Sequence, residues 1–391
     1  MTQRMVIIGA GLAGGKAVEQ LREQGYTGEI TLIGQENHRP YERPPLSKGY
    51  LQGKDEKESV FLHPLAWYGE HKVDLRLGNP ATAVDPAAHR VTLRDGSTVE
   101  YAKLLLATGS APRQLPGATG VRYLRTVDDS AQLRELLDSA RRIVIIGAGW
   151  VGLEVAAAAR AKDVAVTVIE SAELPLLRVL GPEVAQVFAD LHTAHGVDFR
   201  FGAQASDVDG SGATVDGARI EADAVLVGIG ITPNTELAEA AGLTVDNGIV
   251  VDAGLRTSDP DIYAAGDVAN HAHPVLGKGI RVEHWANALN QPAVAVTGML
   301  GGSGSYERQP YFYTDQYDLG MEYRGYVEPG GYDRVVLRGD VEKREFHAFW
   351  LQDNTVLAAM NVNLWDDGDA LAALIGKQVD PDRLADTSIP L

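Results

Sequence analysis

Two glycine-rich segments, each preceded by a run of β-branched residues, constrain the fold of this chain more than any other feature. The first reads VIIGAGLAGG (residues 6–15) and the second reads IVIIGAGWVG (residues 143–152). A short, wholly apolar run of this kind is typical of a buried parallel strand. In the pattern G-x-G-x-x-G, the glycines allow a tight turn, a close approach to a pyrophosphate and close helix packing. One copy is a weak signal, but two copies in the same context predict two dinucleotide sites in one chain.

The segments around each glycine motif predict a pair of βαβ units. In the first unit, a strand at residues 5–9 leads through the glycines to a helical stretch at residues 15–24, which Gly25 ends. A second strand follows at residues 29–34. Residues 141–170 repeat the same order of apolar run, glycine turn, helical stretch and apolar run. This repetition favours an α/β fold with parallel sheets.

Turn-forming and alternating segments predict the remaining elements. The prolines of residues 37–51 exclude a central strand or a helix interior there. Asp95-Gly96 predicts a hairpin within residues 82–99, and GGSGS at residues 301–305 has the composition of a linker. We also expect a meander at 197–227, strands at 103–113 and 224–230, a helix at about 285–300, C-terminal strands at 334–340, 346–352 and 355–362, and a terminal helical stretch.

The order of these elements predicts two Rossmann-like dinucleotide-binding domains and a C-terminal α+β domain. Because material resembling the first half returns after about residue 250, the first domain is expected to be discontinuous. The expected FAD-binding domain comprises residues 1–112 and 249–310. The expected NAD-binding domain comprises residues 113–248, and the C-terminal domain residues 311–391.

Composition excludes several classes of function. The chain has no cysteine, which rules out structural disulfides, a redox-active dithiol and iron–sulfur ligation by this chain. The net charge of −18 disfavours binding to nucleic acid or to an anionic membrane surface. No apolar run is long enough for a bilayer span, and the N-terminus passes directly into a strand without a signal-peptide pattern. We therefore expect a cytoplasmic protein.

The residue that ends the strand after each glycine motif indicates which nucleotide binds. Glu170 ends the second such strand, and a carboxylate there accepts hydrogen bonds from a ribose 2′-hydroxyl and repels a 2′-phosphate. The nearest arginine is Arg178, so the second motif predicts NADH. The alternative is that Glu170 is a solvated charge. After the first motif, Gln35 and Glu36 are the candidates for the other ribose. With NAD assigned to the second motif, FAD is the economical occupant of the first.

Further motifs carry a resemblance to a known group. LLLATG (104–109) and TSDPDIYAAGD (257–267) resemble the glutathione-reductase-type flavoproteins, which bind two dinucleotides. Within that group, RPYERPPLSK (39–48), RYLRTVDD (122–129) and VEHWANALNQ (282–291) resemble the NADH-dependent, FAD-containing ferredoxin reductases of oxygenase systems. This resemblance covers essentially the whole chain, including the C-terminal domain.

The motif and the resemblance together assign residues to FAD. Gln35 stands where these reductases usually carry an acid, which shifts weight to Glu36, and Tyr313 replaces a common tryptophan. The expected FAD-binding residues are Gly9, Gly11, Leu12, Ala13, Gly14, Gln35, Glu36, Arg43, Lys48, Ala81, Ala107, Thr108, Gly109, Arg125, Gly266, Asp267, Trp285 and Tyr313.

A second set is assigned to NAD, and two residues to catalysis. The resemblance implies that Lys48 and Glu154 form a pair beside the flavin and that the pair tunes its reduced states. The expected NAD-binding residues are Gly147, Gly149, Trp150, Val151, Gly152, Glu154, Glu170, Gly230, Glu283 and His284. No metal site is expected, because His271, His273 and His284 lack accompanying ligands at metal-binding spacing.

Trp150 is the residue that the glycine motif explains least, because its position in the pattern needs no bulk. One hypothesis is that its indole gates the nicotinamide pocket and swings aside when NADH enters. The alternative is that the indole packs statically between domains.

The two nucleotide sites predict hydride transfer from NADH to FAD. The resemblance implies single-electron transfer from there to a [2Fe–2S] ferredoxin that serves a cytochrome P450 or a ring-hydroxylating dioxygenase. Without cysteine, the electrons leave the flavin directly. A local basic patch is hypothesised to receive the acidic ferredoxin, drawn from Lys278, Arg281, Arg308, Arg324, Lys343 and Arg344. We expect a monomer or a weak homodimer. The alternatives are an NADH oxidase or diaphorase, or an NADH-responsive interaction protein resembling apoptosis-inducing factor.

Overall fold

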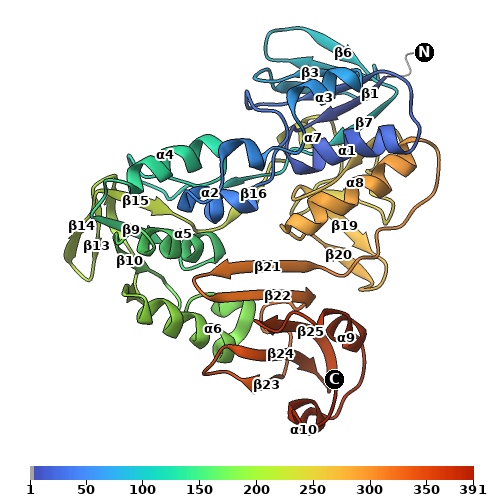
Figure 1. The fold of residues 1–391 in the computed structure, drawn as a ribbon. Coiled ribbons are helices and arrows are strands. Elements are labelled where there is room, and N and C mark those ends of the chain that lie inside the picture. The colour runs from blue at the N-terminus through green and yellow to red at the C-terminus, as the bar shows by residue number, and fades with distance from the viewer. Residues whose placement is uncertain (1–3) are drawn as a thin grey trace. The chain divides into compact units, whose positions relative to one another are not determined.

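The computed structural model describes residues 4–391, which divide into two compact units (Figure 1). The first unit comprises Met1–Arg43, Glu56–Ala111 and Ile231–Arg308, and the second comprises Pro44–Asp55, Pro112–Gly230 and Gln309–Leu391. Residues 1–3 lie outside the described residues. They belong to the N-terminal stretch in which no signal peptide is expected. The three-domain boundaries drawn from the sequence stay a prediction.

The core of the first unit is a five-stranded parallel sheet in the order β18-β7-β1-β2-β3. The central strands β1 and β2 bury every residue and β7 buries all but Lys103, as their apolar sequences predict. Helices α1 and α8 pack against each other beside it. The strands are β1 (Met5–Ile8), β2 (Ile30–Ile33), β3 (Val73–Arg76), β7 (Lys103–Leu106) and β18 (Ile262–Ala264), and the helices are α1 (Leu12–Glu23) and α8 (Trp285–Met299).

Smaller elements complete the first unit. The hairpin predicted at Asp95-Gly96 is confirmed, because β5 pairs with β6 across that turn and Gly96 has a φ of 84°. The remaining elements are η2 (Lys57–Val60), α3 (Leu65–Glu70), β4 (Ala81–Asp85), β5 (Arg90–Leu93), β6 (Thr98–Glu100), β8 (Ser110–Pro112), β16 (Ile231–Pro233), α7 (Glu236–Ala240), β17 (Ile249–Val251), β19 (Ala269–His273) and β20 (Lys278–Ile280).

The second unit contains the second parallel sheet, in the order β11-β10-β9-β15. The proline-rich stretch enters it only as two short helical turns, η1 and α2, in agreement with the expectation that the stretch is neither a central strand nor a helix interior. Its elements are η1 (Pro44–Ser47), α2 (Gly49–Gln52), α4 (Val127–Leu137), β9 (Arg142–Ile146), α5 (Trp150–Arg160), β10 (Ala165–Ile169), α6 (Leu177–Ala194), β11 (Val197–Arg200), β12 (Ser206–Asp209), β13 (Gly212–Val215), β14 (Ala218–Glu221) and β15 (Ala224–Val227).

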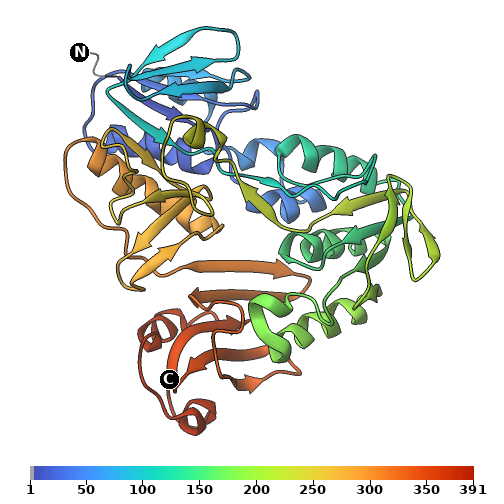
Figure 2. The ribbon, with the colours of Figure 1, turned by 180° about the vertical axis from the view of Figure 1, so that it is seen from behind.

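The C-terminal part of the second unit is an antiparallel sheet in the order β21-β22-β25-β24-β23 (Figure 2, orange to red). The sequence predicted its last three strands but not the first two. Polar residues at buried positions, such as Thr314 and Gln316, hide the apolar alternation of β21. The elements are β21 (Tyr311–Gln316), β22 (Leu319–Gly325), β23 (Arg334–Asp340), β24 (Glu345–Gln352), β25 (Thr355–Val362), α9 (Gly368–Leu374) and α10 (Pro381–Ala385).

Trp350 connects this antiparallel sheet to α6. The indole is fully buried, and its Nε1 donates a hydrogen bond to the carbonyl of Leu180 at 3.0 Å. Leu180 immediately precedes Gly181, whose φ of 76° interrupts the helix before Pro182. The hydrogen bond therefore satisfies a buried carbonyl at the interruption.

Among residues 4–391, no helix is long and apolar enough to cross a bilayer.

We expect Trp350→Phe to lower the free energy of unfolding by about 1–3 kcal/mol, because the buried Leu180 carbonyl loses its donor. Urea denaturation measures this change. Trp365→Phe is the matched control: that indole is 55% exposed, so its replacement should change stability by less than about 0.5 kcal/mol. Equal effects of the two substitutions would contradict the interpretation.

Candidate functional site

The first and third glycines of the first motif are required by the protein itself. Gly9 has a φ of 115°, and a Cβ there would lie 2.0 Å from the carbonyl oxygen of Ala107. A Cβ on Gly14 would lie 1.8 Å from the carbonyl oxygen of Gly9. These two contacts set the turn from β1 into α1, and they bury Leu12 and Ala13 in the first turn of the helix.

Gly11 is different, because no protein atom requires a glycine there. The nearest atom to a Cβ at this position is Nη2 of Arg43, 3.9 Å away. Gly11 is the N-cap of α1, where backbone N–H groups and the helix dipole favour an anion. A glycine, a helix N-terminus and a guanidinium around the same space fit the pyrophosphate of a dinucleotide.

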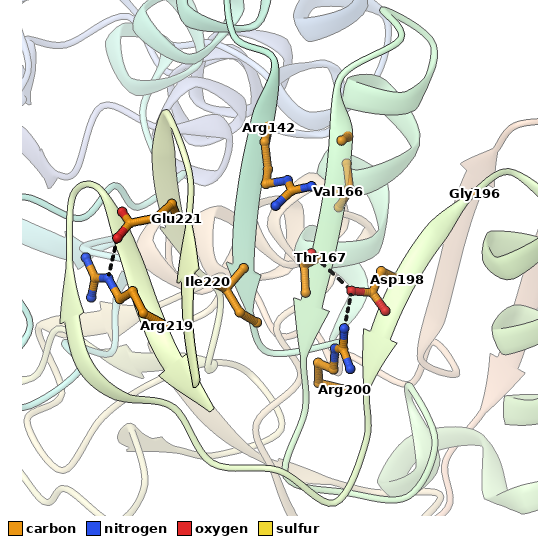
Figure 3. Close-up of a pocket in the computed structure, with 10 residues that line it drawn as sticks. Arg142, Val166, Thr167, Gly196, Asp198, Arg200, Arg219, Ile220 and Glu221 are labelled. Carbon is orange, nitrogen blue, oxygen red and sulfur yellow. Dashed lines mark hydrogen bonds and ion pairs between the residues drawn. The ribbon is translucent and has the colours of Figure 1, made fainter. Parts of the chain in front are cut away.

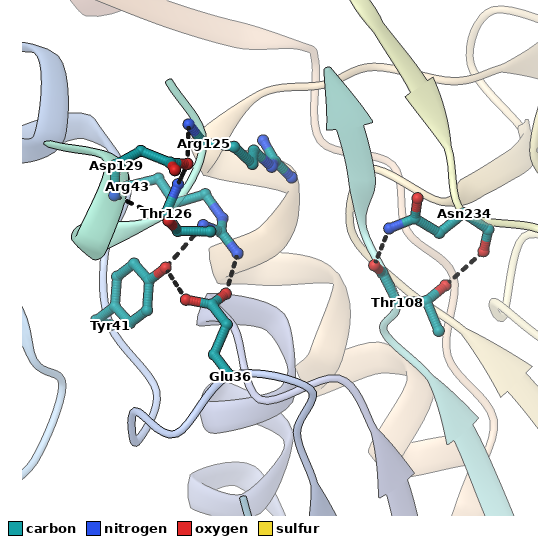
Figure 4. Close-up of polar contacts among 8 residues, drawn as sticks. All are labelled: Glu36, Tyr41, Arg43, Thr108, Arg125, Thr126, Asp129 and Asn234. Atoms are coloured by element: carbon teal, nitrogen blue, oxygen red, sulfur yellow. Dashed lines mark hydrogen bonds and ion pairs between the residues drawn. The ribbon is translucent and has the colours of Figure 1, made fainter. Parts of the chain in front are cut away.

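Arg43 is held in place by Glu36 and Tyr41 (Figure 4). The Tyr41 hydroxyl donates to Oε2 of Glu36 at 2.6 Å, Nη1 of Arg43 donates to the Tyr41 hydroxyl at 3.0 Å, and Nη2 of Arg43 lies 3.4 Å from Oε1 of Glu36. Burial opposes the charge on Arg43, but Tyr41, Glu36 and Asp267 together raise its pKa above the ordinary value. Glu36 thus positions a permanent positive charge. The ribose contacts expected of Glu36 and of the exposed Gln35 stay predictions.

The turn at residues 107–109 is closed by Asn234, a residue that no sequence motif indicated. Nδ2 of Asn234 donates to the carbonyl of Thr108 at 2.8 Å, while Oγ1 of Thr108 donates to the carbonyl of Asn234 at 2.8 Å (Figure 4). The Asn234 amide also donates to the carbonyl of Gly109, which has a φ of 65°. The only indication of this role in the sequence was the position of Asn234 directly before Thr235, which is the N-cap of α7.

Gly266 lies close to the first motif, as the FAD assignment requires. A Cβ on Gly266 would lie 3.2 Å from the Cβ of Ala13, and its amide donates to Oε1 of the buried Gln291 at 2.8 Å. Gln291 was not singled out from the sequence. Of the other residues assigned to FAD, Ala81 begins β4 and Trp285 begins α8, whereas Lys48, Arg125 and Tyr313 belong to the second unit.

The second motif repeats the geometry of the first. Gly147 has a φ of 99°, and a Cβ on it would lie 2.4 Å from the carbonyl oxygen of Gly228. A Cβ on Gly152 would lie 2.3 Å from the carbonyl oxygen of Gly147. Gly149, the N-cap of α5, has no protein atom nearer than 3.9 Å to its Cβ position. The space at Gly149 therefore also fits a pyrophosphate. In the loop after β15, Gly230 has a φ of 101°.

Glu170 closes the second motif through its carboxylate. Oε2 accepts from the amide of Ala148 at 2.7 Å, and Oε1 accepts from the amide of Ala172 at 2.8 Å and the hydroxyl of Ser171 at 3.1 Å. The carboxylate is therefore an ordered acceptor at the end of β10, which weakens the alternative of a freely solvated charge.

Trp150 packs within the second unit, and this geometry favours the static alternative over a gate. Its ring centroid lies 5.7 Å from that of Phe188 on α6, edge to face, and 4.6 Å from that of Phe312 on β21. A swinging indole would lose both aromatic contacts. Val151, the next residue, is 40% exposed.

Lys48 and Glu154 form the buried ion pair expected from the sequence. Nζ of Lys48 lies 2.8 Å from Oε1 of Glu154, whose side chain is 4% exposed. The Ser47 hydroxyl donates to Oε2 at 2.5 Å and the Thr314 hydroxyl donates to Oε1 at 2.6 Å. Nζ of Lys48 also lies 5.4 Å from the centroid of Tyr313. Neither hydroxyl was predicted, since no sequence pattern connects residues so far apart.

Glu283 and His284 lie in the first unit, and the second glycine motif lies in the second. Glu283 pairs with Arg281 at 2.5 Å, and His284 is the N-cap of α8. Their assignment to NAD stays a prediction. Nowhere in residues 4–391 do three or more histidine or acidic side chains form a group that could hold a metal ion.

A hollow of about 430 Å³ in the second unit contains none of the predicted site residues (Figure 3). Two ion pairs line it, Arg200 with Asp198 at 2.9 Å and Arg219 with Glu221 at 3.6 Å. It also exposes the first residues of β9 and β10, Arg142 and Ala165, at the opposite ends of these strands from the glycine motif. Nucleotides bind at the carboxyl ends of parallel strands, so this hollow is not the nucleotide site.

Comparison with known proteins gives matches over the full length. The pyridine nucleotide-disulphide oxidoreductase family matches residues 3–292, and the reductase C-terminal domain matches residues 311–391. The ferredoxin–NAD(+) reductase component of the anthranilate 1,2-dioxygenase system of Burkholderia cepacia is 44% identical over 399 residues, which cover 99% of this chain and 98% of that protein.

A second relative and a solved structure agree with this match. Putidaredoxin reductase of Pseudomonas putida is 39% identical over 404 residues, covering 99% of this chain and 95% of that protein. The crystal structure of the covalent putidaredoxin reductase–putidaredoxin complex superposes with a TM-score of 0.94 at 38% identity, covering 99% of this chain and 97% of that chain.

The two glycines Gly147 and Gly149 should respond to alanine in different ways. Gly149 has a φ of −79° and open space, so Gly149→Ala should change stability by less than about 1 kcal/mol while weakening NAD⁺ binding at least about tenfold. Gly147→Ala should prevent stable folding, because its Cβ would meet a backbone carbonyl. Calorimetric titration with NAD⁺ and thermal unfolding separate the two effects. Unchanged NAD⁺ affinity in Gly149→Ala would refute the assignment of this space.

Proposed function

The chain belongs to the pyridine nucleotide-disulphide oxidoreductase family, and we propose that it is an NADH-dependent, FAD-containing ferredoxin reductase of an oxygenase system. The observation that carries the proposal is the pair of glycine motifs, each with open space in front of its second glycine, in a chain without cysteine. Disulfide chemistry needs a thiol, so this member of the family uses another outlet for its electrons.

The residues of the first unit hold FAD. Gly11 and the N-terminus of α1 receive the pyrophosphate, and the permanent charge of Arg43 compensates it. Asn234 fixes the turn at residues 107–109, which the family resemblance places beside the flavin. When bound, the flavin accepts a hydride from NADH and releases the electrons one at a time.

The residues of the second unit hold NADH. Gly149 and the N-terminus of α5 receive its pyrophosphate, and Glu170 faces the ribose at the end of β10. An ordered carboxylate accepts from a 2′-hydroxyl and repels a 2′-phosphate, which selects NADH over NADPH. Lys48 and Glu154 serve as the catalytic pair, in which Glu154 holds the ammonium group of Lys48 in one position.

The proposed electron acceptor is a [2Fe–2S] ferredoxin that in turn serves a cytochrome P450 or a ring-hydroxylating dioxygenase. Two observations support this acceptor. One relative is the reductase component of a dioxygenase system, and the similar solved structure is a complex of a reductase with putidaredoxin. The absence of cysteine agrees with a direct transfer of electrons from the flavin to an external carrier.

The hypothesised basic patch receives little support from the structure. Four of its six members pair with carboxylates: Arg281 with Glu283, Arg324 with Glu322, Lys343 with Asp340 and Arg344 with Asp318. These pairs neutralise the positive charges locally. Recognition of an acidic ferredoxin therefore does not rest on uncompensated charge at these four positions. The cytoplasmic location and the monomeric or weakly dimeric state stay predictions.

Reduction of cytochrome c by NADH, with and without added ferredoxin, tests the proposed function. A ferredoxin reductase should be slow alone, and its partner should stimulate it at least about tenfold, because the carrier relays the electrons. Oxygen consumption is recorded in parallel. Rapid oxygen consumption without stimulation by any ferredoxin from the same source would favour the oxidase or diaphorase alternative. Binding changes on NADH reduction without turnover would favour an interaction protein.

We expect Glu170→Arg to raise the KM for NADH about tenfold and to increase the preference for NADPH over NADH by at least the same factor. The substitution removes the acceptor for the ribose 2′-hydroxyl and supplies a charge for a 2′-phosphate. Steady-state kinetics with both nucleotides measures the change. Glu173→Arg, the same charge reversal at an exposed neighbouring position, is the control and should leave the preference unchanged. An unaltered preference in Glu170→Arg would place the ribose contact elsewhere.

A further inference from the structure

A chain of buried side chains leads away from Glu154 through the second unit. The hydroxyl of Thr314 donates to Oε1 of Glu154 at 2.6 Å, and Nε2 of Gln316 donates to the hydroxyl of Thr314 at 3.2 Å. Oε1 of Gln316 lies 2.7 Å from Nε2 of His192. Glu154 is 4% exposed, Thr314 and His192 are fully buried, and Gln316 is 1% exposed. None of these three partners is needed to explain the nucleotide sites.

The chemistry of these groups gives the chain one direction. An ionised carboxylate only accepts, so the Thr314 hydroxyl donates to Glu154 and accepts from the amide nitrogen of Gln316. The amide oxygen of Gln316 then accepts from His192, which must carry its proton on Nε2. Burial lowers the pKa of His192 to about 4, so the imidazole is neutral at physiological pH. The hydroxyl of Tyr317 lies 3.4 Å from Nδ1, the nitrogen that this tautomer leaves as an acceptor.

The arrangement of two elements explains how the chain reaches Glu154. Trp150 and Glu154 are four residues apart on α5, a rise of about 6 Å, and therefore share one face of the helix. Phe312 and Thr314 are two residues apart on β21, a rise of about 6.6 Å, and share one face of the strand. The spacings agree, so Trp150 contacts Phe312 and Glu154 contacts Thr314. Gln316 continues the same face towards His192 on α6.

A buried carboxylate such as Glu154 needs several partners, because an unpaired charge is costly to bury. A neighbouring carboxylate adds to the difficulty: burial raises the pKa of Asp315, which Lys48 lowers and Glu154 and Glu322 raise further. Against these effects stand the ammonium of Lys48 and the hydroxyls of Ser47 and Thr314. Hydrogen bonds to an ionised acceptor are stronger than neutral ones, and a donor that is itself polarised by a further donor is strengthened.

We propose that Thr314, Gln316 and His192 are positioning residues that hold the carboxylate of Glu154 in one place beside Lys48, and through that pair set the reduction potential of the bound flavin. The proposal rests on the proposed function insofar as that function places the Lys48–Glu154 pair at the flavin. It gives the C-terminal sheet a part in the redox site, because two of the three residues belong to β21. This series of hydrogen-bonded side chains positions Glu154. It does not conduct protons, because the donor and the acceptor of the Gln316 amide are different atoms.

The direction of the effect follows from the sign of the charge. Less negative charge near the flavin makes its reduction more favourable, and the Glu154 carboxylate is held less firmly in its place when it loses a donor. Thr314→Val removes the donor at nearly constant volume and should shift the midpoint potential of the bound flavin upward. The shift should have the same sign as that of Glu154→Gln and be smaller. Thr314→Ser keeps the hydroxyl and should return the potential to that of the wild type.

The test is a redox titration of these holoenzymes, combined with ¹⁵N NMR of the His192 imidazole. Thr167→Val is the matched control, because Thr167 is also a nearly buried threonine of the second unit, with a hydroxyl that contacts Asp198 instead. The control should move neither readout. Thr314→Val should shift both the potential and the Nε2 resonance of His192. An unchanged potential in Thr314→Val, or an equal shift in Thr167→Val, would overturn the proposal.

Gln316→Met provides a second variant in case Thr314→Val does not fold. It interrupts the chain between Thr314 and His192 while leaving the Thr314 hydroxyl in contact with Glu154. It should shift the potential in the same direction by a smaller amount, and an unchanged potential and imidazole resonance would overturn the proposal. The redox titration uses a chemical reductant, without NADH or ferredoxin. If the variants show the expected shift in potential but the protein does not reduce ferredoxin, the proposed function is contradicted and this inference remains intact.

Discussion

The buried carboxylate of Glu154 joins segments that are far apart in the sequence. It lies on the helix that follows the second glycine motif, and it is bonded to Ser47 and Lys48 from the proline-rich stretch and to Thr314 from β21. A buried charge costs several kcal/mol unless it is paired and hydrogen-bonded, and these partners supply the pairing and the hydrogen bonds. The segments must come together for the charge to be tolerated. The same contacts make Glu154 part of both the fold of the second unit and the proposed catalytic pair.

The two glycine motifs share a backbone solution but differ in the charges around them. In both, the first and third glycines avoid a clash with the protein, and the second leaves space. In the first unit, a guanidinium held by Glu36 and Tyr41 stands near that space. In the second, the carboxylate of Glu170 is bonded to the loop itself. The first arrangement suits a tightly held nucleotide, and the second agrees with the proposed selection by the group at the ribose 2′ position.

The family takes its name from disulfide chemistry, which this chain does not have the residues to perform. Without cysteine, the electrons of the reduced flavin have no internal disulfide to reduce. The pair of Lys48 and Glu154, with the cluster around it, is the part of the second unit that we propose acts on the flavin. Trp150 belongs to the same packing, since its contact with Phe312 lies next to that of Glu154 with Thr314. Its bulk fills the space against that sheet, and its assignment to NAD stays a prediction.

The sequence by itself determined the two βαβ units, the open second glycines, the acid at the end of β10 and the exclusion of thiol chemistry. These are local properties: strand runs, glycine spacing and composition act over a few residues. It did not reveal Asn234 on the turn at Thr108, Ser47 and Thr314 on Glu154, or the strands β21 and β22. Each of these depends on contacts between distant segments, and buried polar residues obscure the apolar pattern of β21. Only the tertiary structure decided how the charge of Glu154 is held, because the energy of a buried charge depends on every group around it.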